Sequence, residues 1–224
     1  PCRKQGESAL VYASLEEAQN QAAPLAQFHF LRQQRAMATG VPYLSLVDFL
    51  ADDQIDYLGG FAVTSGLELE GLIAEFDAQH DDYRSILAKA LADRLAEALA
   101  EYMHQEMRRQ YWGYETGEAY SNEALIREQY QGIRPAPGYP ACPDHSEKET
   151  LFGLLRQGFD PEIQLTESMA MLPVASVSGF YFAHPRSRYF GLGQIDRDQL
   201  QHYTLAKGMN EREAEKWLRP VLKD

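Results

Sequence analysis

Residues 163–184 read "IQLTESMAMLPVASVSGFYFAH", and the run at residues 188–195 reads "RYFGLGQI". Three short segments in this stretch are rich in β-branched and aromatic residues, and Pro173 and a turn around Pro185 separate them. This spacing predicts three strands joined as an antiparallel meander. Helical patterns occur before and after these strands, so the chain is expected to form one α+β domain, a twisted antiparallel sheet flanked by long helices.

Three further patterns lie upstream of these strands. The segment "IDYLGGFAVTSG" (55–66) combines β-prone residues with a glycine pair and predicts a buried strand over 55–64. From Asp81 to Met103 apolar residues recur every three or four positions, as in an amphipathic helix over about 81–110. Residues 15–36 are rich in Gln and Ala and predict a helix. We therefore expect a helical N-terminal segment (1–40) followed by the main domain (41–224).

Capping signals place four shorter helices. One helix is expected from Ser121 to about Gly132, where a glycine suits a left-handed cap. Asp144 and Glu147 have the spacing of a capping box, which predicts a helix over roughly 145–157. The same spacing joins two further pairs near the end of the chain and predicts two closing helices separated by Gly208. These pairs are Asp196 with Gln199 and Asn210 with Glu213.

Composition excludes several classes of protein. With 224 residues, 45% of them hydrophobic, the chain can bury a full core. The formal net charge of -12 would repel a phosphate backbone, so nucleic acid is not an expected partner. No apolar run is long enough to span a bilayer, and the start "PCRKQGESAL" lacks the apolar core of a signal peptide, so we expect a cytoplasmic protein without membrane contact. Two cysteines are too few for a disulfide framework.

Motifs for catalysis are weak. Cys142 and His145 could form half of a zinc site, but no second pair has ligand spacing. Ser178, His184 and Asp196 could be assembled into a triad, but no nucleophile elbow accompanies them. The glycines of "GLGQID" (191–196) do not follow the dinucleotide-binding pattern. The sequence therefore predicts neither a metal site nor a catalytic residue.

The segment "RPAPGYPACPDH" (134–145) has the features of a binding loop. Its four prolines restrict the backbone before any ligand arrives, which lowers the entropic cost of binding. Gly138 would permit close approach of a ligand, and Tyr139 could supply an aromatic wall. Arg134 could hold a carboxylate in a bidentate pair. The alternative is a rigid connector whose arginine pairs with a neighbouring acid.

The longer run "GIRPAPGYPACPDHSEK" (132–148) resembles the activation domain of cobalamin-dependent methionine synthase. That family binds S-adenosylmethionine through an Arg-x-x-x-Gly-Tyr motif, which corresponds here to Arg134, Gly138 and Tyr139. Four further blocks resemble the family in the same order: "AQHDDYRSILAKALADRLAEALAEYMH", "YWGYETGEAYSNEALIREQYQ", "LTESMAMLPVASVSGFYFAHPRSRYFGLGQIDRDQL" and "KGMNEREAEKWLRPVL". The resemblance covers about residues 55–222, whereas the first forty residues match only loosely.

The resemblance implies a role in cofactor repair. In that family, cobalamin carries a methyl group from methyltetrahydrofolate to homocysteine and is occasionally oxidised to an inactive form. The activation domain then presents S-adenosylmethionine to cobalamin on a partner domain, while a flavodoxin-like protein or a diflavin reductase supplies an electron. The chain would be part of a methyltransferase and would not make methionine by itself.

The resemblance also assigns residues to the ligand. Arg134 would grip the methionine carboxylate, Gly138 would allow close approach, and Tyr139 would lie near the sulfonium or the corrin. Backbone groups of two neighbours would donate or accept hydrogen bonds, and an acid and two aromatics match family positions at the ligand. These further residues are Pro135, Ala136, Glu97, Tyr189 and Phe190.

Alternatives remain for several of these residues. Glu97 could instead pair with Arg94 within its helix, Tyr189 and Phe190 could belong to the core, and His145 could face cobalamin or only begin a helix. The family's domain is longer at its N-terminus, where an acid joins the ligand site, so the chain is either a fragment of a large enzyme or a separate reactivation subunit. A rival function is an acidic module that docks a flavoprotein or a cobalamin domain without binding a ligand.

Overall fold

The computed structural model describes residues 1–35, 38–158 and 162–223. The chain divides into two compact units. Unit 1 comprises Pro1–Gly59, Gln131–Leu154 and Phe180–Asp224, and unit 2 comprises Gly60–Tyr130 and Leu155–Gly179. Helices combine with small sheets, so the predicted α+β class is confirmed. The predicted division at residue 40 stays a prediction.

Unit 1 begins with a three-stranded antiparallel sheet of β1 (Cys2–Gln5), β2 (Ser8–Val11) and β3 (Ala26–His29), in that order. The helix predicted over 15–36 is wrong, because among the described residues of this range only α1 (Leu15–Gln19) is helical and β3 follows it. Ala and Gln favour a helix, but helix propensity is a weak prior that tertiary packing overrides. In the segment Gln27–Phe30, Phe28 and Phe30 alternate with polar residues and are buried, which is the period of a strand.

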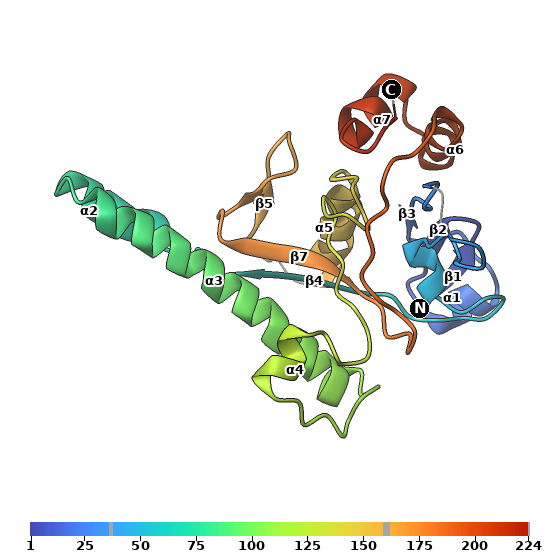
Figure 1. The fold of residues 1–224 in the computed structure, drawn as a ribbon, viewed down its shortest axis with the longest axis horizontal. Helices are drawn as coiled ribbons and strands as arrows, with labels where there is room; N and C mark the ends of the chain where they lie inside the picture. Colours follow the sequence, from blue (N-terminus) through green and yellow to red (C-terminus); the bar gives the residue numbers. More distant parts are fainter. Residues whose placement is uncertain (36–37, 159–161, 224) are drawn as a thin grey trace. The chain divides into compact units, whose positions relative to one another are not determined.

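The rest of unit 1 supplies helices and a hydrophobic cluster. A short 3-10 helix η1 (Leu46–Phe49) follows the sheet, α5 (Glu147–Gly158) begins in this unit, and α6 (Arg197–Lys207) and α7 (Glu211–Leu218) lie side by side at the C-terminus (Figure 1). The last two helices bury apolar side chains together with the segment that precedes them and with a residue that follows β3. These side chains are Leu31, Leu192, Ile195, Leu200, Tyr203, Ala214 and Leu218.

Unit 2 contains most of the remaining strands. The predicted strand at 55–64 is observed as β4 (Gly59–Thr64), which pairs with β7 (Ser176–Tyr181), while β5 (Gln164–Leu165) pairs with β6 (Met171–Leu172) in a separate sheet. The predicted meander is therefore wrong, since β7 pairs with a strand more than 100 residues away. Residues 188–195, all of which the structure describes, form no strand.

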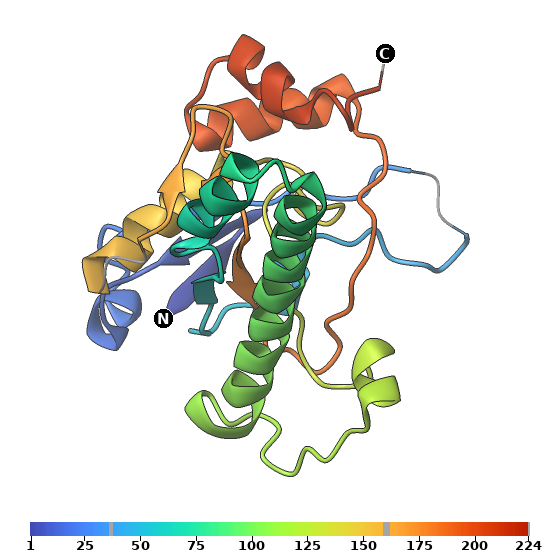
Figure 2. The ribbon, with the colours of Figure 1, turned by 90° about the vertical axis from the view of Figure 1, so that its left-hand side faces the viewer.

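The long helix of unit 2 is confirmed as α3 (Asp82–Glu106), which continues into the wider turn η2 (Met107–Tyr111), and α2 (Leu69–Ala78) packs beside it (Figure 2). Its apolar stripe does not form the buried face: Ile86 and Leu95 are 66% and 62% exposed. The buried positions of α3 instead include Ala92, Ala96 and Ala100. Small side chains at four-residue spacing form the buried face, whereas the prediction placed the large apolar residues there.

Helix caps were predicted with mixed success. Asn210 and Ser121 each accept a hydrogen bond from the backbone three residues later, as expected, and Gly208 ends α6 in the left-handed region. The helix after Ser121 is α4 (Asn122–Ile126) and ends before Gly132. Two capping boxes are wrong. Asp196 makes no side-chain cap, and Asp144 and Glu147 are held by residues far away in the sequence, as described below.

In the described part of the chain, no helix has the length and apolar character to cross a bilayer.

Candidate functional site: a proline-rich loop in unit 1

The loop at residues 134–145 is attached to the backbone of unit 1 on two sides. Ile133 exchanges two backbone hydrogen bonds with Phe182, both of 3.0 Å, and Phe180 donates to the carbonyl of Pro135 at 2.9 Å. On the other side Leu192 donates to the carbonyl of Pro140 at 2.9 Å. The loop is therefore fixed by segments about 50 residues further along the chain as well as by its prolines.

The middle of the loop closes on itself. Gly138 donates to the carbonyl of Cys142 at 2.7 Å, and Cys142 donates to the carbonyl of Tyr139 at 2.9 Å. Tyr139 in turn donates to the carbonyl of Ala136 at 3.2 Å. Gly138 has φ +96°, a conformation that costs free energy for any residue with a Cβ. These bonds make a compact double turn that leaves the Tyr139 side chain 64% exposed.

The reason for a glycine at 138 differs from the one predicted. A Cβ at this position would lie 2.6 Å from Nδ1 and Nε2 of His145 and closer still to Cε1. The space left by the missing side chain is therefore filled by an imidazole of the protein. Contact of Gly138 with a ligand stays a prediction, and the need for glycine is explained without it.

Arg134 and Tyr189 lie together although 55 residues separate them. The backbone N–H of Arg134 donates to the hydroxyl oxygen of Tyr189 at 3.0 Å. Both side chains are half-buried, as is Phe190, whose ring lies 6.3 Å from that of Phe49 in an edge-on contact. Tyr189 therefore supports the loop. Phe190 packs against another aromatic ring, as expected if it belongs to the core rather than to the ligand site.

The other predicted ligand residues have protein partners of their own. The carbonyls of Pro135 and Ala136 each accept a bond within unit 1. Glu97 lies in unit 2, on α3, where its Oε2 is 2.7 Å from Nη1 of Arg94, and the two side chains are 59% and 79% exposed. The intrahelical pair named as the alternative for Glu97 is therefore present, and its contact with a ligand stays a prediction.

A buried ion cluster that sequence reasoning missed holds the end of the loop. Lys207 Nζ on α6 lies 2.7 Å from Asp144 Oδ2 and 2.8 Å from Glu147 Oε1, and both carboxylates are almost completely buried. Tyr203 donates to Asp144 at 2.6 Å, and Ser146 donates to Asp144 through its backbone and its hydroxyl. No local pattern signals this cluster, because the lysine lies 60 residues beyond the acids.

Burial and charge act in opposite directions on these acids. Burial alone would raise the pKa of Asp144, but the charge and hydrogen bond of Lys207 hold it below its usual value of 3.8. For Glu147 burial prevails, and its pKa is raised above 4.5 despite Lys207. Burial also lowers the pKa of nearby His29 to about 4, aided by the charge of Lys207. The cluster therefore joins the loop, α5 and α6 through groups that would be costly to leave unpaired.

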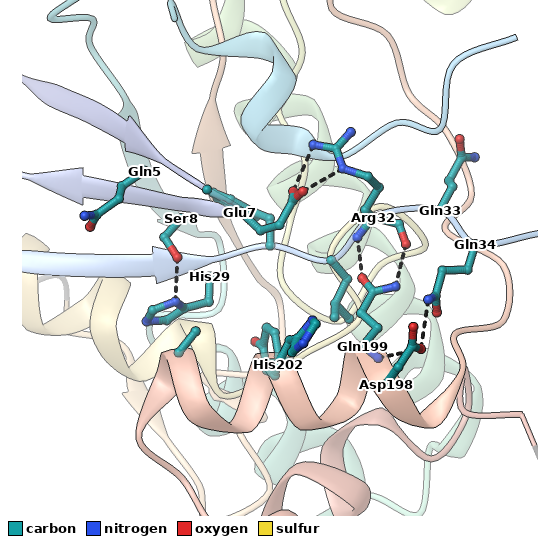
Figure 3. A pocket seen from close by; sticks show the side chains of 15 residues that line it. Gln5, Glu7, Ser8, His29, Arg32, Gln33, Gln34, Asp198, Gln199 and His202 are labelled. Atoms are coloured by element: carbon teal, nitrogen blue, oxygen red, sulfur yellow. Dashed lines mark hydrogen bonds and ion pairs between the residues drawn. The ribbon is translucent and has the colours of Figure 1, made fainter. Parts of the chain in front are cut away.

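Unit 1 also has a groove of about 440 Å³ between the first sheet and α6 (Figure 3). Its polar side chains bind one another: Arg32 pairs with Glu7, and the amide of Gln199 both donates to and accepts from the backbone of Arg32. None of the predicted ligand residues lines it. The groove is therefore separate from the candidate site, and its polar groups serve the packing of α6 against the segment after β3.

Comparison with known proteins assigns the chain to a family. Residues 1–208 match the sequence model described as "Vitamin B12 dependent methionine synthase, activation domain". The chain belongs to this family, and the match includes the first forty residues, which the sequence had matched only loosely.

Among solved structures, the chain is similar to one described as "Crystal Structure of the MetH Reactivation Domain bound to AdoHcy". The two share 50% sequence identity with a TM-score of 0.93, and the alignment covers 100% of this chain and 68% of that one.

Proposed function

We propose that this chain binds S-adenosylmethionine through the loop at 134–145 and presents its methyl group for reductive methylation of cobalamin. The observation that carries the proposal is the hydrogen bond from Arg134 to Tyr189. It joins two residues that the family resemblance assigns to the ligand, on a backbone already fixed by the protein. The similar structure with bound AdoHcy supports a ligand of this chemistry.

The residues at the loop suit such a ligand. Arg134 offers a guanidinium that can form a bidentate pair with the methionine carboxylate. The exposed ring of Tyr139 offers an aromatic face, which attracts a sulfonium cation as it does other cations. The family resemblance also assigns Glu97, on α3 of unit 2, to the ligand, whose positive charge its carboxylate would complement. The rigid loop would orient the methyl donor at little entropic cost.

Cobalamin would be bound by a partner domain, and a flavodoxin-like protein or a diflavin reductase would supply the electron. When bound there, cobalamin supplies the cobalt that accepts the methyl group. The part played by this chain is to bind and orient the donor, which requires no acid, base or metal of its own. Transfer of a methyl group from methyltetrahydrofolate to homocysteine would belong to the whole methionine synthase.

Calorimetry tests the binding step. Arg134→Ala should weaken S-adenosylmethionine binding by about 2–4 kcal/mol, because a carboxylate would lose its charged partner in a partly desolvated site. Arg219→Ala, at the end of α7, is the matched control and should bind normally. Unchanged affinity in the Arg134 variant would contradict the assignment. No binding by the folded wild-type chain at millimolar ligand would favour the rival role as a docking module.

The transfer step has its own readout. With a cobalamin-binding partner domain, S-adenosylmethionine and a one-electron reductant, the chain should promote the absorption change from oxidised cobalamin to methylcobalamin. If the ligand is bound and that change does not occur, the chain has no role in remethylation.

A further inference from the structure

His145 occupies an unusual position in the loop. The edge of its ring formed by Nδ1, Cε1 and Nε2 fills the space beside Gly138, so the ring packs directly against the double turn. His145 is half-buried and lies two residues before the first residue of α5. A change in the position of this imidazole would therefore change the turn that carries Tyr139.

Lys148 fixes this imidazole from α5. Its Nζ lies 3.0 Å from Nδ1 of His145, and an ammonium has only donors, so Nδ1 must accept. A nitrogen that accepts carries no proton, which places the ring proton of a neutral His145 on Nε2. The Lys148 side chain is itself buried, which holds its aliphatic part in place and lowers the pKa of its ammonium below 10.5.

The charged groups around His145 favour its neutral form. Burial lowers its pKa below 6.5, the charge of Lys148 lowers it further, and only Asp144 acts in the opposite direction. The charge of Asp144 is engaged by Lys207 at 2.7 Å. A protonated His145 would place two positive groups 3.0 Å apart, and the ring could then no longer accept from Lys148.

We propose that Lys148 is a positioning residue of the ligand loop: it donates to Nδ1 of His145, holds the neutral ring against Gly138, and so maintains the turn that presents Arg134 and Tyr139. This inference rests on the proposed function for its effect on S-adenosylmethionine. The arrangement of Lys148, His145 and Gly138 is independent of any ligand, so the two can fail separately.

The first experiment is ligand-free. In the full chain labelled with ¹⁵N at histidine, the ring nitrogens of His145 should report the Nε2-protonated tautomer, and its pKa should be below 6.5. Lys148→Met should raise that pKa toward 6.5 without reaching it, because burial still lowers it, while Lys148→Arg, which keeps a charged donor, should not raise it. Lys89→Met, on the exposed surface of α3, is the control and should leave His145 unchanged. An Nδ1-protonated His145 in the wild type would overturn the inference.

The second experiment asks whether Lys148 acts through His145. Lys148→Met should weaken S-adenosylmethionine binding about tenfold, as expected for a lost hydrogen bond to a charged group, and Lys148→Arg should restore most of the affinity. His145→Ala should have a similar effect. In the His145→Ala background, Lys148→Met should then cost less than about twofold more, because its partner is already absent.

Each outcome has one meaning. Additive losses in the double variant would show that Lys148 does not act through His145 and would overturn the inference. If the His145 resonances behave as expected but the wild-type chain binds no S-adenosylmethionine, the proposed function fails and the interaction between Lys148 and His145 stands. If a variant fails to fold, the tautomer and pKa of wild-type His145 still decide.

Discussion

Replacing Lys207 by Met is expected to be among the most destabilising single changes in unit 1. Among the ion pairs of the described residues, the ammonium of Lys207 is the only cation within 3 Å of Asp144 and Glu147. The side chains of these two acids are 2% and 0% exposed. Without Lys207 both acids remain buried near each other with no opposite charge. Removing one partner from a buried ion pair typically costs about 3–5 kcal/mol, and we expect a loss in that range at pH 7.

The loss should depend on pH in a defined direction. In the variant, burial without Lys207 would raise the folded-state pKa of at least one acid above its unfolded value, adding to the rise already present at Glu147. Such a group adds stability that is complete below the unfolded pKa and is lost as pH rises through the folded pKa. Lowering the pH from 7 to 5 should therefore reduce the difference from wild type, by up to about 1.4 kcal/mol per pH unit for one proton.

Urea unfolding at pH 7 and pH 5 measures this difference. Lys223→Met is the matched control, because Lys223 lies 3.2 Å from Asp196 with both side chains more than half exposed, where a pair contributes less than about 1 kcal/mol. A loss in the Lys207 variant no larger than in this control, or a loss that does not shrink at pH 5, would refute the reasoning.

Two further changes test the loop and its support. Gly138→Ala should destabilise the chain by about 2–4 kcal/mol, because the new Cβ overlaps His145 and φ is positive. In denaturant unfolding, combining it with His145→Ala should recover part of this loss. No recovery would mean that another contact requires the glycine. The pKa of His29 is about 4 in the folded chain and 6.5 in the unfolded chain, so the chain should lose roughly 3 kcal/mol of stability as pH falls from 6.5 to 4. His29→Gln should make stability nearly independent of pH over this range. An unchanged pH profile would contradict the assignment.

Much of the candidate site could be predicted from the sequence. The prolines of the loop restrict φ wherever they occur, and the Arg-x-x-x-Gly-Tyr spacing together with the neighbouring blocks identified the family. The length of α3, the Asn210 cap and Gly208 at the end of α6 also followed from local patterns. These features depend on interactions within one or two turns of chain, which neighbouring residues determine.

Tertiary structure decided the partners. Asp144 and Glu147 have the spacing of a capping box, yet their carboxylates bind Lys207, because buried carboxylates are costly without an opposite charge. β7 pairs with β4 instead of the strand before it, and Gly138 is required by His145. Arg134 meets Tyr189 only because β7 and the segment after it run beside the loop. Local sequence gives each group its chemistry, but which distant group it meets depends on how the whole chain buries its apolar surface and satisfies its polar atoms.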